Sequence, residues 1–306
     1  MAILSGLTIS GGGITIAGGG AVITSKKAIF GYGYTDTNVS MTNLVSDTGV
    51  VATDTTGVGS ARYSPAAAGY GTDKAIFGYG YTSNFSAVTN LVSNTGVVAT
   101  DTTGVGTARV YLAAAGYGTD KAIFGYGMSP STAITNLVSN TGVVSNDVTG
   151  VGTARYALAA AGYGTDKAIF GYGTPGYLSM TNLVTNTGVV GNDVTGVGTA
   201  RYGLAATGYG TDKAIFGYGD SSGGRTAITN LVSNTGVVAT DTTGVGTARY
   251  YHAAAGYGAD KAIFGYGVAG SGNTAITNLV SNTGVVATDT TGVGTVRGYL
   301  AAASYG

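Results

Sequence analysis

The sequence predicts an all-β fold, a six-bladed β-propeller with four short strands per blade, preceded by an extended glycine-rich arm. The first observation behind this prediction is a repeat, read most clearly at 198–219 as GTARYGLAATGYGTDKAIFGYG. A lysine precedes each AIFGYG copy, and subtracting neighbouring numbers gives steps of 47, 47, 46, 46 and 48 residues: Lys27, Lys74, Lys121, Lys167, Lys213 and Lys261. A fixed period of this length is typical of solenoids and propellers, whose units bury their apolar faces only against their neighbours.

The second observation is that turn signals divide each unit into four short strands. KAIFGYG is predicted to be one strand, and a segment that differs in every copy follows it. TNLVSNTGVVATD supplies two more strands around SNTG, because glycine accepts the positive φ of a hairpin turn. The LAAAGYG stretch is the fourth strand, and Gly-Thr-Asp turns it back into the next KAIFGYG. Four strands in a unit of about 45 residues are typical of a propeller blade.

The unit resembles the kelch repeat. Arginine and tyrosine precede the small-residue strand, as in Arg155-Tyr156 and Arg201-Tyr202, and a tight turn follows. The next strand ends in a glycine pair split by tyrosine, as in Gly171-Tyr172-Gly173. The unit departs from the kelch pattern because the chain contains no tryptophan and lacks the usual aspartate- and proline-rich turn. The resemblance covers residues 27–306 and implies a propeller, a fold that hosts many functions.

The ends of the repeat region predict how the ring closes. The chain enters the first unit at KAIFGYG and leaves after the small-residue segment 300–303, so the first unit lacks a strand and the last has a spare one. Pairing the two removes open sheet edges. An open solenoid is the alternative. The resemblance to kelch propellers further implies that the LAAAG strands line a central channel and that the VVATD strands lie outermost.

Residues 1–26 stand apart from the repeats and are predicted to form an extended docking arm. LTISGGG and ITIAGGG are short β-branched segments separated by triple glycine, with too little apolar surface to fold alone. A frayed terminus is the alternative. The arm interpretation is favoured because a merely solvated tail has no need of Ile14, Ile16, Val22 and Ile23. The segment is not expected to be a signal peptide or a membrane span, since it lacks a basic leader and glycines interrupt every apolar run.

Composition disfavours several classes of partner. The 14 Lys and Arg residues balance 14 Asp residues, so the formal net charge is zero. Nucleic acids and anionic membranes both need a basic surface, and neither is expected as a partner. Near-zero charge on a tyrosine-rich surface instead favours association, as in a component of a larger assembly. Cysteine is absent, which excludes disulfides and thiolate sites.

Sequence variation among the copies predicts one recognition face. The two hairpin turns hardly vary, whereas the segments after KAIFGYG differ in length and sequence, as do the residues after each repeat arginine. Variable loops on a rigid scaffold are the usual arrangement for recognition, although unconstrained drift is an alternative. Aromatic and arginine side chains make good anchors, so the candidate binding residues are taken from these segments. They are Tyr34, Phe85, Tyr177, Arg225, Tyr251 and His252.

The sequence does not predict an enzyme, a metal site or a cofactor. His252 is the only histidine, and other copies have leucine or proline at its position, so it is a loop substitution and not a general base. An aspartate repeated once per copy is expected to cap a turn or to pair with the repeat lysine or arginine. GYGTDK is glycine-rich but leads into a strand, so it is not predicted to bind phosphate.

Near-identical tandem copies, Thr/Gly/Ala-rich strands and a glycine-rich arm resemble virion appendage proteins of bacteriophages. That resemblance implies a non-enzymatic structural and binding protein of the virion, such as a tail fibre, tail tip or capsid decoration component. In this interpretation residues 1–26 dock onto other virion proteins and the variable loops contact a host surface glycan or protein. The alternative is a glycan-binding, lectin-like propeller of cellular or secreted origin, with weak sites that gain affinity through multivalency.

Overall fold

A computed structural model of the chain describes residues 7–10, 13–16 and 25–306. The described residues form strands, turns and loops, and none of them lies in a helix, so the all-β prediction is confirmed for this part of the chain. It follows that no helix among them is long and apolar enough to cross a membrane.

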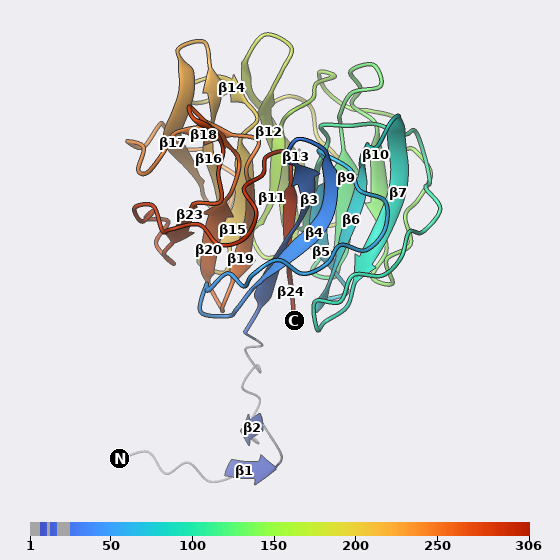
Figure 1. The fold of residues 1–306 in the computed structure, drawn as a ribbon. Helices are drawn as coiled ribbons and strands as arrows, with labels where there is room; N and C mark the ends of the chain where they lie inside the picture. Colours follow the sequence, from blue (N-terminus) through green and yellow to red (C-terminus); the bar gives the residue numbers. More distant parts are fainter. Residues whose placement is uncertain (1–6, 11–12, 17–24) are drawn as a thin grey trace.

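Six antiparallel sheets repeat one strand order within residues 27–305, with the KAIFGYG strand in the middle of each (Figure 1). The inner strands are β5 (Ala66–Tyr70), β8 (Ala113–Tyr117), β11 (Ala159–Tyr163), β15 (Ala205–Tyr209), β19 (Ala253–Tyr257) and β24 (Ala301–Tyr305). The middle strands are β3 (Lys27–Tyr34), β6 (Lys74–Tyr81), β9 (Lys121–Gly125), β12 (Lys167–Gly173), β16 (Lys213–Ser221) and β20 (Lys261–Gly265). The third strands are β4 (Asn38–Val45), β7 (Phe85–Val92), β10 (Thr135–Val138), β13 (Leu178–Val184), β17 (Gly224–Val232) and β23 (Thr277–Val280).

Short strands extend two of these units at the ends of their middle strands. β14 (Arg201–Tyr202) pairs with the end of β16. β18 (Arg249–Tyr250), β21 (Val268–Ala269) and β22 (Gly272–Asn273) form a small sheet of their own.

The middle strands are buried on both faces because each packs between two neighbouring copies. Ile29 and Phe30 are fully buried, as are their equivalents. A Cβ atom added at Gly31 would lie 2.7 Å from the Phe77 ring of the next copy, and the same approach recurs at each equivalent glycine. The absence of a side chain at this point therefore lets adjacent sheets interlock.

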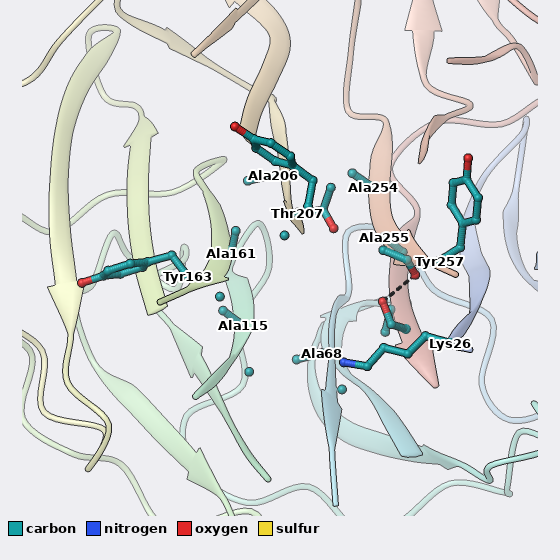
Figure 2. A pocket seen from close by; sticks show the side chains of 18 of the residues that line it. Lys26, Ala68, Ala115, Ala161, Tyr163, Ala206, Thr207, Ala254, Ala255 and Tyr257 are labelled. Carbon is teal, nitrogen blue, oxygen red and sulfur yellow. Dashed lines mark hydrogen bonds between the residues drawn. The ribbon is translucent and has the colours of Figure 1, made fainter. Parts of the chain in front are cut away.

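The inner strands surround a central cavity. Each contacts the inner strand of the next copy in the order β5, β8, β11, β15, β19 and β24, and β24 contacts β5 again. The cavity has a volume of about 290 Å³, and Figure 2 shows small side chains such as those of Ala115, Ala161 and Ala254 around it. The position predicted for the LAAAG strands is therefore observed, and their small residues suit the close approach of six strands.

The two ends of the repeat region are joined as the sequence predicts. β24 pairs with β3 along five residues, from Ala301 opposite Gly31 to Tyr305 opposite Lys27. The C-terminal Gly306 donates its backbone N–H to the Asp73 carbonyl (2.8 Å). The last segment of chain thus completes the first sheet.

The fourth strand of each unit differs from the prediction. The VVATD segment pairs with the third strand only through isolated bridges, such as Val45 with Val51 and Thr42 with Thr55. The Asn43 side chain explains the interruption, because its amide donates to the Ala52 carbonyl (3.0 Å), an acceptor that a regular ladder would use. The outer segment therefore follows the sheet without forming a regular strand.

Part of the predicted arm lies within the described residues. β1 (Leu7–Ser10) and β2 (Gly13–Ile16) form an antiparallel hairpin with Leu7 opposite Ile16. The rest of the arm prediction, apart from Ser25 and Lys26, lies outside the described residues.

Candidate functional site

The repeats place invariant turns and variable segments at opposite ends of the sheets. Four middle strands begin at a Gly-Thr-Asp turn, β20 begins at Gly-Ala-Asp, and β3 begins after Ser25-Lys26. Each middle strand leads at its other end into a variable segment, so the turns and the variable segments are separated by the length of the strand. Near the Gly-Thr-Asp turn, the SNTG turn of the neighbouring copy approaches closely: a Cβ atom on Gly71 would lie 2.9 Å from the Asn140 carbonyl. We call this end the turn face. The loop face comprises the variable segments, 34–40, 81–87, 128–133, 174–179, 220–227 and 268–275, and the two residues after each repeat arginine.

The turn face is held by polar contacts that recur from copy to copy. Lys74 Nζ lies 2.8 Å from Asp73, and the Asn94 amide donates to the same carboxylate (3.2 Å). The hydrogen bond from Lys74 holds the pKa of Asp73 below its ordinary value. Lys26 takes the aspartate position where the ends of the repeat region meet, and its side chain lines the central cavity (Figure 2). Its backbone N–H and C=O still bond to Gly258, so the contacts between copies continue through the join.

A buried arginine lies beneath the loop face in every copy. Arg201 has a fully buried side chain, and its guanidinium lies 4.3 Å from the centre of the Tyr172 ring in the preceding copy. It donates to the Asn230 side chain (2.6 Å) and to the carbonyls of Tyr218 (2.7 Å) and Thr199 (2.8 Å). A guanidinium satisfied in this way stabilises the contact between copies and is not free to bind a ligand.

The repeat aspartate beside this arginine is also structural. Asp241 accepts hydrogen bonds from the Thr199 N–H and hydroxyl of the preceding connection, and from the Asn230 amide of its own copy. Burial acts to raise the pKa of Asp241, but these hydrogen bonds and the nearby Arg201 charge outweigh it and lower the pKa. A carboxylate held ionised by fixed donors joins two copies and does not exchange protons near neutral pH.

The same contacts span the two ends of the repeat region. Thr295 donates to Asp54 through its hydroxyl (2.6 Å) and its N–H (2.9 Å). Arg297 donates to the Asn43 side chain (2.7 Å) and to the Tyr32 carbonyl (3.0 Å). The last copy therefore supports the first as every other copy supports its neighbour.

The loop face carries a continuous network of aromatic rings. At its centre Tyr251 and Tyr299 stack, with ring centroids 4.2 Å apart and planes 25° from parallel. From these two rings, contacts of 6.3 Å or less between ring centroids link eight further tyrosines and one phenylalanine from different copies. The linked residues are Tyr34, Tyr63, Tyr81, Phe85, Tyr111, Tyr156, Tyr177, Tyr202 and Tyr250. We call these eleven residues the aromatic network.

The structure brings together five of the six candidate binding residues. Tyr34, Phe85 and Tyr177 lie at the outer parts of the network with 37–40% of their surface exposed. Tyr251 lies at its centre and is partly buried. Arg225 is exposed, and its guanidinium lies 4.9 Å from the centre of the Tyr250 ring in the network.

The sixth candidate, His252, does not lie on the surface. Only 4% of it is exposed, and its ring packs against Tyr218 (5.1 Å) and Phe264 (5.6 Å). It occupies the position of the buried Leu204 and Leu300 of other copies, and the shared backbone directs its side chain into the core in the same way. Neither ring nitrogen has a hydrogen-bond partner among the described residues. Burial, and then the nearby charges of Arg249 and Arg201, hold the pKa of His252 well below its ordinary value.

Sequence reasoning missed most of the tyrosines that connect the candidates. Six of them, Tyr63, Tyr111, Tyr156, Tyr202, Tyr250 and Tyr299, lie one or two positions after a repeat arginine. Their clustering follows from the closed order of the inner strands, because each of these residues lies two or three positions before an inner strand. The sequence signal for this cluster is the tyrosine that recurs after the repeat arginine. Only the cyclic arrangement of the copies brings these tyrosines into contact.

Among the described residues no three His, Cys, Asp or Glu side chains group closely enough to hold a metal ion. Comparison with models of known protein families gave no match, and comparison with curated proteins gave none. The geometry of the loop face is thus the principal guide to function.

Proposed function

We propose that the chain is a six-bladed, kelch-like β-propeller that acts as a non-enzymatic recognition protein. The cyclic contacts of the six inner strands and the pairing of β24 with β3 support the propeller. The functional part of the proposal is carried by the convergence of four candidate residues from different copies in one aromatic network, with a fifth, Arg225, in contact with it. Loops on a rigid scaffold that present tyrosine, serine, glycine and asparagine are typical of surfaces selected for binding.

The proposal assigns different tasks to the two ends of the molecule. The loop face contacts a receptor on a host surface, and residues 1–26 dock the chain onto other proteins of a bacteriophage virion. The arm meets β3 at Lys26, on the turn face, so docking through it leaves the loop face free. Repetition and composition, described above, support the virion setting.

Two variants test the two tasks separately. Deleting residues 1–24 is expected to abolish incorporation into the assembled particle while the repeats remain folded, because Lys26 and its bonds to Gly258 are retained. Replacing Phe85 and Tyr177 together by alanine is expected to leave incorporation intact and to weaken adsorption of the particle to its host at least tenfold. Normal incorporation of the truncated chain would refute the docking task, and normal adsorption of the double variant would refute the recognition task.

A further inference from the structure

The centre of the aromatic network is a rigid surface. Tyr111, Tyr251 and Tyr299 have positive φ values of 57°, 48° and 57°. Residues other than glycine rarely adopt this backbone conformation. Their backbones belong to a chain of hydrogen bonds between copies, in which Tyr299 donates to Tyr251 (2.8 Å) and Tyr251 donates to Gly203 (2.6 Å). The neighbouring copies therefore fix a strained backbone that presents three tyrosine rings.

The equivalent positions of the other copies show that this arrangement does not require tyrosine. They carry Ser64, Ala157 and Gly203, with the same sign of φ. Packing between copies accounts for the rings near the centre, but not for Phe85 and Tyr177, which lie out in the variable segments with 40% and 37% of their surface exposed. The network is thus larger than the fold needs.

The loop face carries very little charge. Its variable segments contain Asp36, Asp220 and Arg225 as their only charged side chains. The guanidinium of Arg225 is directed to the Ala269 carbonyl and the Tyr250 ring. A charged ligand placed on this surface would lose its hydration with few counter-charges to replace it, which is unfavourable. The surface instead favours an uncharged ligand that has both apolar faces and hydroxyl groups.

The tyrosine hydroxyls suit such a ligand. Burial raises the pKa of Tyr251 and of Tyr299, and neighbouring tyrosines raise both further, so these phenols stay protonated. A protonated phenol donates one hydrogen bond and accepts others. Ring faces beside such groups combine an apolar contact area with hydrogen bonding at the edge.

We propose that the aromatic network, centred on the stacked rings of Tyr251 and Tyr299, binds an uncharged carbohydrate. The C–H face of a pyranose ring would lie on the tyrosine rings, and its hydroxyls would bond to phenols and to side chains of the variable segments. A surface already fixed by its backbone loses little conformational freedom on binding, which favours affinity for a small ligand. This inference rests on the proposed recognition function and specifies the ligand class of the same surface.

The experiment titrates the full chain with a panel of neutral oligosaccharides built from glucose, galactose, mannose or N-acetylglucosamine. A matched panel carries uronic acid or sialic acid. Binding is measured by calorimetry and by the change in tyrosine fluorescence. We expect at least one neutral oligosaccharide to bind, and its closest acidic counterpart to bind at least tenfold more weakly.

Variants then locate the site. Tyr299→Ala is expected to lower the affinity at least tenfold, whereas Tyr299→Phe, which keeps the ring, lowers it less than threefold. If Tyr299→Ala is unstable, Tyr177→Ala replaces it as the test, because Tyr177 lies in an exposed segment remote from the strained centre. Tyr177→Ala is expected to lower the affinity at least threefold. Lys213→Ala on the turn face is the matched control and should bind as the unaltered chain does. Equal affinity of all four variants would overturn the proposed site.

Adsorption to host cells separates this inference from the proposed function. Loss of adsorption after periodate oxidation of the cell surface, but not after protease treatment, supports a carbohydrate ligand. Loss after protease treatment alone, with no neutral oligosaccharide bound, overturns the carbohydrate inference and leaves the recognition function standing. Absence of specific adsorption under every treatment would overturn the recognition function itself.

Discussion

The turn face and the loop face are built by the same six repeats, yet they differ in what varies. At the turn face the neighbouring copies meet through the backbone, as where the Gly71 N–H donates to the Asp120 carbonyl, and short polar side chains such as Asp73 and Asn94 bond within each copy. At the loop face, a layer of buried arginines fixes the copies, and the residues above that layer are free to differ. The difference teaches that sequence is most constant where the copies contact one another, and that most of the variation lies in side chains beyond those contacts.

The largest expected effect comes from removing one arginine of the buried layer. Arg201→Met keeps most of the side-chain volume but leaves two buried acceptors, on Asn230 and Tyr218, and the partly buried Thr199 carbonyl without this donor. Each unsatisfied buried acceptor costs about 1–3 kcal/mol, so the free energy of unfolding should fall by at least about 2 kcal/mol. Denaturant unfolding followed by circular dichroism measures the change.

Arg225→Met is the matched control for this prediction. Arg225 is exposed and lies above the layer, so the same substitution should alter the free energy of unfolding by less than about 0.5 kcal/mol. Equal effects at the two positions would remove the distinction between the layer and the surface above it.

A pair of glycines compares the two faces directly. Gly96, in a SNTG turn, and Gly176, in a variable segment, have nearly the same positive φ, +82° and +81°. A Cβ atom on Gly96 would lie 2.6 Å from the Tyr305 hydroxyl, whereas one on Gly176 would meet nothing within 4 Å. Both alanine variants bear the backbone strain, about 1–2 kcal/mol. Only Gly96→Ala must also displace a buried tyrosine, at a further cost of about 1–3 kcal/mol.

Thermal unfolding of the two glycine variants measures the difference between them. A clearly lower midpoint for Gly96→Ala is expected. If Gly176→Ala is as destabilising as Gly96→Ala, the variable segments are as tightly constrained as the turns, and the comparison of the two faces fails.

His252 adds a pH dependence to one copy. The His252 ring packs against Tyr218 and Phe264, and burial together with the nearby charges of Arg249 and Arg201 disfavours its imidazolium form. Because the folded-state pKa lies below the unfolded value of about 6.5, the unfolded chain binds the proton first. Stability is therefore lost as pH falls below about 6.5, by about 1.4 kcal/mol per pH unit until the folded pKa is reached.

The matched variant is His252→Leu, which restores the residue of other copies. Urea unfolding at pH 7.5, 6 and 5 should show a smaller loss of stability on acidification for His252→Leu than for the unaltered chain. Parallel curves for the two proteins would show that His252 titrates normally, and would contradict its burial.

Much of the fold could be predicted from the sequence because the same pattern of strands and turns occurs in six copies. The period, the turn glycines and the spare strand at 300–303 together predict the sheets and the pairing of β24 with β3. The outer segment could not be predicted, since its irregularity depends on the Asn43 amide reaching the Ala52 carbonyl across the sheet. That contact is a side-chain effect which strand patterns do not express.

The candidate site was predictable in part for the same reason. Comparison of copies indicates which segments vary, and so indicates Tyr34, Phe85 and Tyr177. The comparison does not indicate whether a varying side chain is buried. His252 differs from its equivalents in the other copies, as loop residues do, but it takes the place of a buried leucine. Nor does it indicate that Tyr111 and Tyr299 meet, because that contact depends on the cyclic arrangement of the inner strands.

The smallest predicted effect concerns Ser304, in the strand that completes the first sheet. Every other copy has glycine there, and the Ser304 hydroxyl donates to the Gly256 carbonyl of the adjacent inner strand (2.7 Å). Ser304→Ala keeps the Cβ atom and removes only this bond. A partly buried hydrogen bond contributes about 0.5–1.5 kcal/mol, so the free energy of unfolding should fall by about 1 kcal/mol.

Thr207→Ala is the control, because it removes a hydroxyl from another inner strand and restores the alanine found in the five other copies. The Thr207 hydroxyl makes no hydrogen bond to the described residues, so a change below about 0.5 kcal/mol is expected. If Ser304→Ala also leaves the free energy of unfolding unchanged, β24 is held only by its pairing with β3 and by its packing. A measurable loss confined to Ser304→Ala would instead show that β24 is held to the neighbouring inner strand β19 by a side-chain bond that the other copies lack.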